Sequence, residues 1–598
     1  MKVALQQIKR LAPYLPSGTK RYIWIYIVVS CLLSLLDIAA LMLLGISLSA
    51  MLAGNDVVIP YVGSVPPDKY VWLLLAVSLL ILLKSTLSLM QQWAATRKFA
   101  SFELNLGLRL FEAYMGAPWV DRLSRTSSKL VRMADVGVSA VISGLLLPMM
   151  QLPATIVSSV LILATLIVVQ PLTAAITIGY LGAMALLMQK VLTKKSLEAG
   201  VVNQRYSYRV ASIMTDMVGA LKEITLQNKF DEVHEVLRIN RTHAARARAN
   251  MRFLGQVPKF IMDSALIGGF LIIGGVSYLV EGSLSEAIGA VVMFAVAGMR
   301  LVPAITSFQS TSNQVNANRA QVTAVLQDMR RADRYREETE DLGKEELLAD
   351  PKELILENVT FQYPTGEEPA VTDVSLRIRM GSFVGIVGES GSGKSTLIDI
   401  ILGLLVPQEG ALHLDSQNIK DVLGAWRSRV GYVPQEVSLF DGTVAQNIAL
   451  TWKEEPDIPR VIKCLKKAQL WEAIKARPGG VHAQVGDRGM ALSGGQRQRL
   501  GIARALYTDP YVLILDEATS ALDTKTEAKV SEALSGLHGE VTVVQVAHRL
   551  STVRDVDQLF FMEDSFLLAS GTFDEVVDRV PAFREQARLA GLVADGEE

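Results

Sequence analysis

A glycine-rich stretch, GESGSGKST at residues 388–396, has the residue types and spacing of a loop that holds phosphate. Gly388, Gly391 and Gly393 allow the backbone to curl tightly, so that its N–H groups can point at phosphate oxygens. The apolar FVGIV before the loop predicts a buried strand, and the apolar TLIDIILGLL after it predicts a helix. A phosphate loop requires this strand–loop–helix context, which argues against a purely structural glycine turn.

The polar residues of this loop are candidate ligands of phosphate and metal. We expect Lys394 to contact the β- and γ-phosphates of a nucleotide, and the Ser395 hydroxyl to contact Mg²⁺. The N-terminus of the following helix adds a favourable dipole. The complete candidate loop comprises Gly388, Glu389, Ser390, Gly391, Ser392, Gly393, Lys394, Ser395 and Thr396.

A second stretch, YVLILDE at residues 511–517, predicts an apolar strand that ends in two acids. Side chains at the carboxyl end of a strand face the ligand crevice of an open α/β sheet. There Asp516 would hold Mg²⁺, directly or through water, and Glu517 would polarise the attacking water. The plain alternative is a strand end with two solvated acids, and the nearby phosphate loop argues against it.

A third stretch, LSGGQRQRLGIARAL at residues 492–506, joins a rare loop sequence to an amphipathic helix. With this stretch, the soluble part of the chain resembles the ATP-binding cassette (ABC) proteins. In that family two such domains sandwich two ATP molecules head to tail. The resemblance implies that the loop residues close on the ATP held by a second subunit, and these residues are Ser493, Gly494, Gly495 and Gln496.

The remaining motifs of the family occur in the expected order. The resemblance assigns Tyr363 in VTFQYP to stacking on adenine, and Gln435 in YVPQE to sensing Mg²⁺ and the membrane domain. It assigns His548 in VAHRL to the γ-phosphate, which makes this residue, with Glu517, a candidate catalytic group. SALD at residues 520–523 matches the loop that couples two active sites.

The composition of the chain changes sharply along its length, and this change indicates which domain holds these residues. Its 598 residues are 50 % hydrophobic, with a mean hydropathy of +0.30 that is high for a soluble protein. Long apolar runs come first, a densely charged segment follows, and the last part alternates strand and helix patterns. We therefore predict a membrane domain over 1–326, a charged linker over 327–352, a nucleotide-binding domain over 353–590 and a tail over 591–598.

Six apolar segments are long enough to span a bilayer, because a spanning helix needs about 20 apolar residues. Basic residues gather at the N-terminus and in the two long connections, whereas the short connections carry almost none. By the positive-inside rule, both termini and the long connections are cytoplasmic. The six segments are roughly 22–52, 71–92, 141–169, 172–192, 260–280 and 286–306.

The two long basic connections have the apolar spacing of packed helices. We expect the spanning helices to continue out of the bilayer and to present short contact elements to the soluble domain. The alternative is a pair of flexible basic loops that bind lipid head groups.

Six spans ahead of one ABC domain resemble the exporter half-transporters. The expected fold is an α-helical six-span membrane domain of the ABC exporter type, fused to an α/β P-loop nucleotide-binding domain that uses ATP and Mg²⁺. The single nucleotide domain implies a dimer. Because the catalytic motifs are intact, a homodimer is favoured, although an intact chain can also be half of a heterodimer. The resemblance implies a multi-pass protein of a bacterial cytoplasmic membrane, and the net charge of −1 gives no sign of a nucleic-acid partner.

Two stretches bear on the substrate, GALKEITLQNKF (219–230) and AVAGMRLVPAITSFQS (295–310), because both resemble lipid-linked oligosaccharide flippases. Ionisable residues inside spans usually mark a functional pathway. Lys84 and Arg300 lie ~20 Å and ~21 Å from the outer ends of their spans, at 1.5 Å per residue. We hypothesise that they receive an anionic head group such as a lipid pyrophosphate. The alternatives are snorkelling to the interface or pairing with Asp263.

The leading interpretation is thus an ATP-driven exporter or flippase of an amphipathic, anionic lipid-linked substrate. A multidrug or peptide exporter is the second interpretation, and aromatic residues, which a drug cavity would favour, make up only 7 % of the chain. An ATP-gated membrane regulator is a third. Such proteins often lack a catalytic residue, whereas Glu517 and His548 are both present here.

Overall fold

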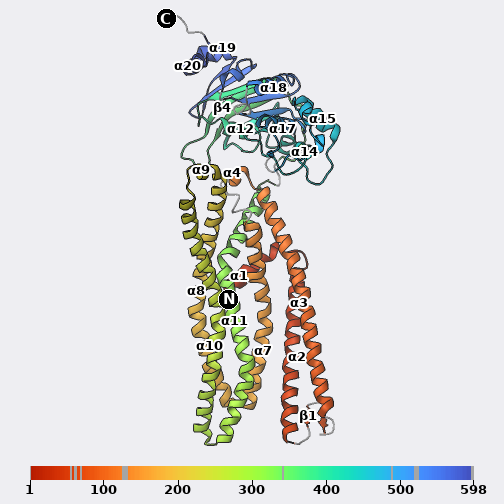
Figure 1. Ribbon diagram of the computed structural model, residues 1–598, viewed down its shortest axis with the longest axis vertical. Coiled ribbons are helices and arrows are strands. Elements are labelled where there is room, and N and C mark those ends of the chain that lie inside the picture. Colours follow the sequence, from red (N-terminus) through yellow and green to blue (C-terminus); the bar gives the residue numbers. More distant parts are fainter. Residues whose placement is uncertain are drawn as a thin grey trace. The chain divides into compact units, whose positions relative to one another are not determined.

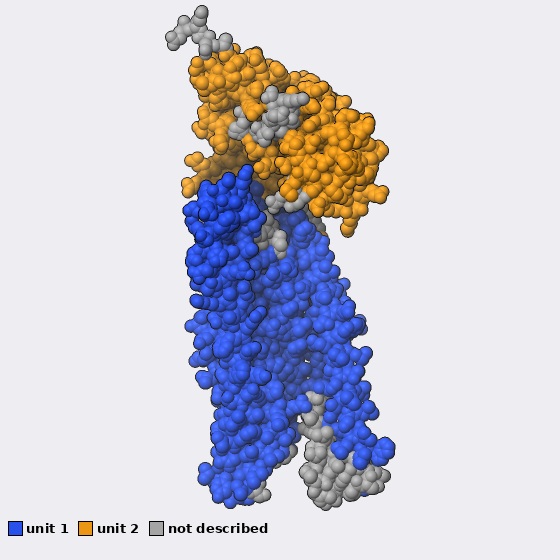
Figure 2. Space-filling model, viewed as in Figure 1, with its two compact units in different colours: residues 1–117, 122–335 blue, residues 118–121, 336–598 orange. Residues whose placement is uncertain are grey.

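The computed structural model describes residues 2–53, 57–59, 63–66, 70–123, 132–339, 343–486, 489–517, 524–547 and 549–593. The chain forms two compact units (Figure 2). The membrane unit comprises residues 1–117 and 122–335, and the nucleotide unit comprises residues 118–121 and 336–598. Four residues from the first long connection, Pro118–Asp121, therefore group with the nucleotide unit.

Long helices make up most of the membrane unit (Figure 1). A short antiparallel pair, β1 (Val57–Ile59) and β2 (Gly63–Val65), follows the second helix. The helices are α1 (Lys2–Leu11), η1 (Ala12–Tyr14), α2 (Thr19–Ala53), α3 (Tyr70–Met115), α4 (Trp119–Leu123), η3 (Met133–Gly137), α6 (Val138–Val141), η4 (Ile142–Leu146), α7 (Leu147–Val169), α8 (Pro171–Gly219), α9 (Leu221–Leu226), α10 (Phe230–Glu281) and α11 (Leu284–Thr339).

The prediction of six spans is confirmed. Among the described residues, six helices are long and apolar enough to cross a membrane. Several are far longer than a span requires: α8 has 49 residues and α10 has 52. At 1.5 Å per residue, α8 is about 74 Å long, against a hydrocarbon core of about 30 Å. More than half of this helix must therefore lie outside the hydrocarbon.

The helices of the membrane unit pack through two apolar clusters. One joins α1, α2 and α3 to the C-terminal half of α11, and the other joins α7, α8 and α10 to the N-terminal half of α11. Helices α8 and α10 run side by side for most of their length (Figure 1). Gly200 lets α8 approach α11 closely, since a Cβ there would lie 2.0 Å from the carbonyl oxygen of Ala317.

The start of the charged segment is helical, because α11 continues to Thr339. Its acids bind the N-terminal part of the chain. Tyr14 donates to Asp333 at 2.6 Å, and Tyr114 donates to Asp328 at 2.9 Å. These bonds fasten the C-terminal end of α11 to the start of the chain and to α3.

The nucleotide unit contains a six-stranded sheet in the order β12-β11-β5-β10-β9-β8 and a four-stranded sheet in the order β4-β3-β6-β7. In the first sheet all neighbouring strands are parallel except β12, which pairs with β11 in the antiparallel sense. The strands are β3 (Glu353–Phe361), β4 (Val371–Arg379), β5 (Phe383–Gly388), β6 (Glu409–Leu414), β7 (Gln417–Asn418), β8 (Val430–Val433), β9 (Val512–Asp516), β10 (Thr542–Val546), β11 (Gln558–Glu563) and β12 (Phe566–Gly571).

Helices pack against these sheets and complete the nucleotide unit. They are α12 (Lys394–Ile401), α13 (Leu423–Ser428), α14 (Val444–Ala449), α15 (Ile458–Lys467), α16 (Trp471–Lys475), η5 (Gly480–His482), α17 (Gly494–Leu506), α18 (Thr524–Ser535), η7 (Leu550–Val553), α19 (Phe573–Arg579) and α20 (Pro581–Leu589).

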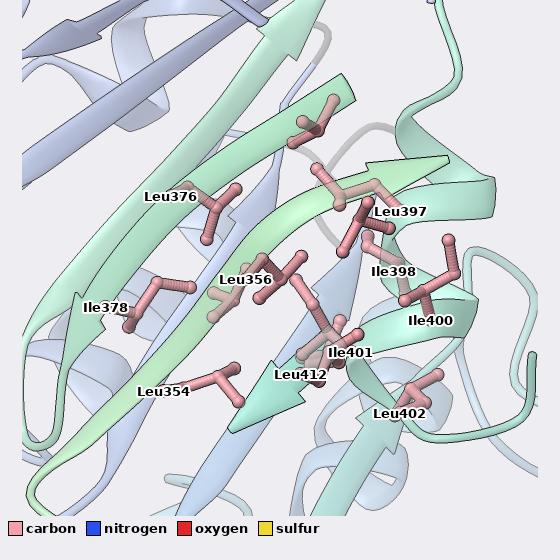
Figure 3. Packing of buried hydrophobic residues seen from close by; sticks show 14 of the residues in the cluster. Leu354, Leu356, Leu376, Ile378, Leu397, Ile398, Ile400, Ile401, Leu402 and Leu412 are labelled. Atoms are coloured by element: carbon pink, nitrogen blue, oxygen red, sulfur yellow. The ribbon is translucent and has the colours of Figure 1, made fainter. Parts of the chain in front are cut away.

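An apolar cluster fixes helix α12, which follows the phosphate loop. Figure 3 shows Leu354 and Leu356 of β3 and Ile378 of β4 on one side, and Leu397 and Ile401 of α12 on the other. All five side chains are at most 1 % exposed. Burial of each such side chain contributes about 1.5–3 kcal/mol, so this packing holds the start of α12 firmly against the sheet.

Candidate nucleotide-binding site

The phosphate loop lies at the carboxyl end of β5 and leads into α12, as its sequence predicts. Gly391 and Gly393 have φ of +89° and +95°, values that favour glycine. A Cβ at Gly393 would lie 2.2 Å from the carbonyl oxygen of Ala370, and one at Gly388 would lie 2.0 Å from that of Met562. The glycines are therefore required by close backbone approach, and they leave a cradle that a side chain would fill.

Lys394 lies inside this loop. Its side chain is buried, with 6 % exposure, and its Nζ donates to the carbonyl oxygens of Gly388 at 2.9 Å and Glu389 at 2.6 Å. Burial lowers the pKa of Lys394, and the carboxylates of Glu517 and Asp516 oppose that shift. The loop thus surrounds one cation, whose charge is offset by the two acids at the end of β9.

Asp516 ends β9, the strand next to β10 in the sheet, and Glu517 directly follows it. Gln435 donates from Nε2 to Glu517 Oε2 at 2.7 Å, so two predicted site residues meet directly. Glu517 has φ of +51°, which costs a non-glycine residue roughly 1–3 kcal/mol. Its backbone N–H donates to the carbonyl oxygen of Val546 at 3.2 Å, which helps to hold this conformation.

Tyr432 is a site residue that the sequence analysis missed. Its hydroxyl donates to Asp516 Oδ2 at 3.1 Å, and burial, followed by the Asp516 carboxylate, raises the pKa of the phenol. Tyr432 lies on β8, which pairs with β9 in parallel register, three residues before Gln435. The sequence could have indicated Tyr432, because it lies three residues before Gln435 in the strand that leads to that residue.

Tyr363, the candidate for adenine stacking, lies beside α12. Its hydroxyl is 3.2 Å from Thr396 Oγ1, and its ring packs edge-to-face on Phe361 with centroids 5.1 Å apart. The stacking role stays a prediction. His548 and the SALD loop at 520–523 lie outside the described residues.

The signature loop starts helix α17. Ser493 is the N-cap: its Oγ accepts from the Gln496 backbone at 3.3 Å, and the Gln496 side chain accepts from the Ser493 backbone at 3.1 Å. Ser493 and Gly494 are exposed, whereas Gly495 and Gln496 are half-buried. The reciprocal cap fixes the loop at the start of the helix with two residues facing outward.

Helix α4, in the first long connection, provides a second contact, whose residues the sequence analysis did not name. Trp119 donates from Nε1 to Asp399 Oδ2 at 3.2 Å, and Trp119 and Val120 pack against the apolar cluster that holds α12. Burial raises the pKa of Asp399 to about 6, the Trp119 hydrogen bond opposes the shift, and the Asp516 carboxylate adds to it. At the junction with α3, Arg122 Nε donates to the carbonyl oxygen of Ala117 at 2.7 Å.

The site carries the donor types that Mg²⁺ requires. Among the described residues, no group of three or more His, Cys, Asp or Glu could hold a metal ion. Magnesium needs no such group, because it is usually bound by one or two carboxylates together with substrate phosphates and water. Asp516 and the Ser395 hydroxyl beside the glycine cradle fit that pattern.

The candidate substrate residues lie on two spanning helices. Lys84 is half-buried on α3 and Arg300 is exposed on α11. They follow the N-terminal ends of these helices, Tyr70 and Leu284, by about 21 Å and 24 Å at 1.5 Å per residue. Their role as substrate contacts stays a prediction.

A phosphate loop on a mostly parallel sheet, joined to six long apolar helices, defines a nucleotide-dependent membrane protein. The family model described as ABC transporter matches residues 371–520. The ATP-dependent lipid A-core flippase of Ralstonia nicotianae is 30 % identical over 492 residues, which cover 80 % of each chain. The chain belongs to the ABC exporter family.

Two further relatives match over a shorter length. The ATP-dependent lipid A-core flippase of Cupriavidus pinatubonensis is 42 % identical over 228 residues, 38 % of this chain and 39 % of the relative. The sophorolipid transporter of Starmerella bombicola is 42 % identical over 234 residues, 38 % of this chain and 18 % of the relative. In these two alignments the chain therefore spans about two fifths of one relative's length and about a fifth of the other's.

A solved structure confirms the fold. The structure of a bacterial Atm1-family ABC exporter with ATP bound matches with a TM-score of 0.76 at 22 % identity. The match covers 98 % of this chain and 100 % of that chain. The predicted combination of a six-span helical domain and a P-loop domain is thereby confirmed.

Proposed function

We propose that the chain is one half of a homodimeric ATPase that moves an amphipathic, anionic lipid-linked substrate out of the cytoplasmic leaflet of a bacterial inner membrane. The observation that carries the proposal is the set of groups around the phosphate loop. Lys394 lies within that loop, its charge is offset by Asp516 and Glu517, and Gln435 holds the Glu517 carboxylate. This set suits binding and hydrolysis of ATP.

Each of these residues has a chemical task in the proposal. The Lys394 ammonium would move from the loop carbonyls to the β- and γ-phosphates, and the loop N–H groups would bind phosphate oxygens. Ser395 and Asp516 would hold Mg²⁺, with Gln435 beside them, and the ion would neutralise charge on the phosphates. Glu517 would orient the attacking water, and His548 would contact the γ-phosphate.

A second copy of the chain would complete the site. The exposed Ser493 and Gly494, with Gly495 and Gln496, would close on the ATP bound by the partner. The intact catalytic motifs favour a homodimer, and a heterodimer with a related chain is the alternative that oligomer analysis would detect.

The link from ATP to the membrane would pass through α4. Trp119 binds Asp399, which lies on the helix that starts at the phosphate loop, and α4 directly follows the spanning helix α3 in the chain. Movement of α12 on ATP binding would therefore reach α3. Both termini would be cytoplasmic in this arrangement.

The lipid substrate is supported by two observations of different kinds. Relatives that match the chain are named for lipid A-core and for a sophorolipid, both of which are lipids. Lys84 and Arg300 place cationic groups within spanning helices, where a phosphate-bearing head group would be bound.

Reconstitution in liposomes tests the proposal. ATPase activity and ATP-driven transfer to the outer leaflet would be measured for a fluorescent lipid-linked glycan pyrophosphate and for a neutral phospholipid. The glycan lipid should raise the ATPase rate and move, whereas Glu517→Gln should stop both. Equal response to the neutral lipid would contradict an anionic substrate, and no transfer of any lipid would contradict the flippase.

A further inference from the structure

Two side chains from the segment around β8 bind Asp516 and Glu517. Strand β8 lies at one edge of the six-stranded sheet, parallel to β9. The Tyr432 hydroxyl donates to Asp516 Oδ2 at 3.1 Å, and Gln435 Nε2 donates to Glu517 Oε2 at 2.7 Å. The motifs of the family include Gln435 and both acids, so Tyr432 is the member of this set that still has no assigned role.

The register of the two strands explains why a tyrosine suits this position. Tyr432 is paired with Ile514, two residues before Asp516. Paired residues of neighbouring strands point to the same face of a sheet, and so do residues two apart on one strand, so Tyr432 and Asp516 share a face. The Cα of Asp516 lies about 6.6 Å beyond that of Ile514 at ~3.3 Å per residue, a distance that a long side chain with a terminal donor can bridge.

Strand β8 is held in the sheet by contacts other than this hydrogen bond. It pairs with β9 at four positions, from Val430 opposite Val512 to Val433 opposite Leu515. Val433 is also fully buried in an apolar cluster of the nucleotide unit. What the Tyr432 hydroxyl adds is therefore a fixed orientation of the Asp516 carboxylate.

The Tyr432 hydroxyl is a donor that keeps its proton near neutral pH. Burial, followed by the charge of Asp516, raises the pKa of this phenol above its ordinary value of 10.0. An ionised aspartate accepts hydrogen bonds through both of its oxygens, so a donor fixed on Oδ2 leaves Oδ1 for another ligand. Hydrogen bonds of this kind orient carboxylates that bind metals, and their loss typically lowers metal affinity about 10–100-fold.

We propose that Tyr432 is a positioning residue for the metal site of this ATPase: its hydroxyl holds Asp516 Oδ2, so that the other carboxylate oxygen is available to the Mg²⁺ that accompanies ATP. The inference rests on the proposed role of Asp516 as a ligand of that ion. Gln435 has a different task, because its amide holds Glu517, the residue proposed to orient the attacking water. Tyr432 therefore acts on the affinity for the metal and not on the hydrolytic step itself.

The effect of Mg²⁺ on nucleotide affinity tests the inference. Isothermal titration of the purified full-length protein would give the dissociation constant of a non-hydrolysable ATP analogue in EDTA and in Mg²⁺. The ratio of these two constants measures how much more tightly the protein-bound nucleotide holds Mg²⁺ than the free nucleotide does, because coupling between two ligands is reciprocal. Tyr432→Phe should lower this ratio about tenfold and should leave the affinity in EDTA within about twofold. The retained affinity in EDTA also shows that the variant is folded.

The matched control is Tyr511→Phe, which removes another tyrosine hydroxyl that donates to an acid. Tyr511 binds Asp350 and directly precedes β9, at the opposite end of the strand from Asp516. Its ratio should equal that of the wild type. ATPase assays add a second measurement: in Tyr432→Phe the Mg²⁺ concentration that gives half the maximal rate should rise, while kcat at saturating Mg²⁺ is kept.

Asp516→Asn separates this inference from the proposed function, because it removes the proposed metal ligand itself and should abolish the effect of Mg²⁺ on affinity. A lowered ratio in Asp516→Asn with an unchanged ratio in Tyr432→Phe would overturn the inference alone. Unchanged ratios in both variants would overturn the metal role of Asp516 as well. Equal losses of affinity in Mg²⁺ and in EDTA for Tyr432→Phe would also overturn the inference, because the hydroxyl would then only support the fold.

Discussion

The two units of the protein hold their polar residues in different ways. In the nucleotide unit, side chains from strands far apart in sequence form direct bonds, such as Gln435 to Glu517 at 2.7 Å. In the membrane unit, the candidate substrate residues Lys84 and Arg300 lie about 21 Å and 24 Å from the starts of their helices and belong to no motif. A ligand of fixed shape such as ATP constrains the spacing of the residues that bind it along the chain. A lipid substrate in a bilayer constrains mainly the charge of its binding residues and their position along the spanning helices.

The largest effect is expected in the nucleotide unit, where one substitution should remove ATP hydrolysis. Glu517→Gln removes the carboxylate that would activate water, and a positioned general base contributes about 10²–10⁴-fold to a rate. We expect the ATPase rate to fall by that factor while ATP still binds, because Lys394 and the loop are unchanged. Phosphate release and nucleotide binding would be measured side by side.

The control for that variant is Glu436→Gln, one residue after Gln435, which removes an exposed acid near the site. Its ATPase rate should stay close to the wild-type value. A Glu517→Gln protein that keeps more than about a tenth of the rate would show that another group acts as the base, since a factor of ten is worth only ~1.4 kcal/mol.

The second effect is expected in the membrane unit, where one substitution should weaken stimulation of the ATPase by substrate. Arg300→Ala should reduce the stimulation of ATPase activity by a lipid-linked pyrophosphate about tenfold, which corresponds to ~1.4 kcal/mol, a modest value for a charge-assisted contact. Basal ATPase should survive, since Arg300 lies in the membrane unit. Arg331→Ala, an exposed arginine further along α11, is the control. Undiminished stimulation in Arg300→Ala would remove this residue from the substrate site.

The two units also differ in how much of each could be predicted from the sequence. The phosphate loop was predictable because Gly388 and Gly393 are the residue type that close backbone approach demands. Hydropathy found the six spans, and the apolar spacing of the long connections predicted that the helices continue beyond them, as α8 does. The residue at which α8 ends, Gly219, was not predictable, because the last part of that helix depends on packing against α10. The bond between Trp119 and Asp399 joins positions 280 residues apart and follows no local pattern.

The third prediction concerns α4, whose Trp119 binds the nucleotide unit and which directly follows the spanning helix α3. Trp119→Phe keeps an aromatic ring in the apolar cluster but removes the donor to Asp399. A hydrogen bond to a partly charged partner contributes about 1–2 kcal/mol, so substrate stimulation should fall severalfold. The KM for ATP should not change, because the phosphate loop keeps all its residues. Trp452→Phe, an exposed tryptophan of the nucleotide unit, is the control. A changed KM with normal stimulation would contradict the linking role.

The smallest effect concerns the pH dependence of Asp399. Burial raises its pKa from an ordinary value of 3.8 to about 6 in the folded protein. The folded state therefore binds the proton more tightly than the unfolded state. The stability that this proton brings is fully present below pH ~4, and it is lost as the pH rises through ~6.

Asp399→Asn tests that linkage, because the amide keeps an acceptor for Trp119 and never ionises. At pH 7.5 the variant should melt at a temperature equal to or slightly above that of the wild type, since it avoids the cost of a buried carboxylate. Between pH 6 and 4.5 the advantage should shrink, because the wild-type carboxyl becomes protonated there. Thermal unfolding of the detergent-solubilised protein at these pH values measures the trend. A gap that widens toward low pH would mean that the carboxylate stabilises the fold, and that its bond to Trp119 outweighs burial.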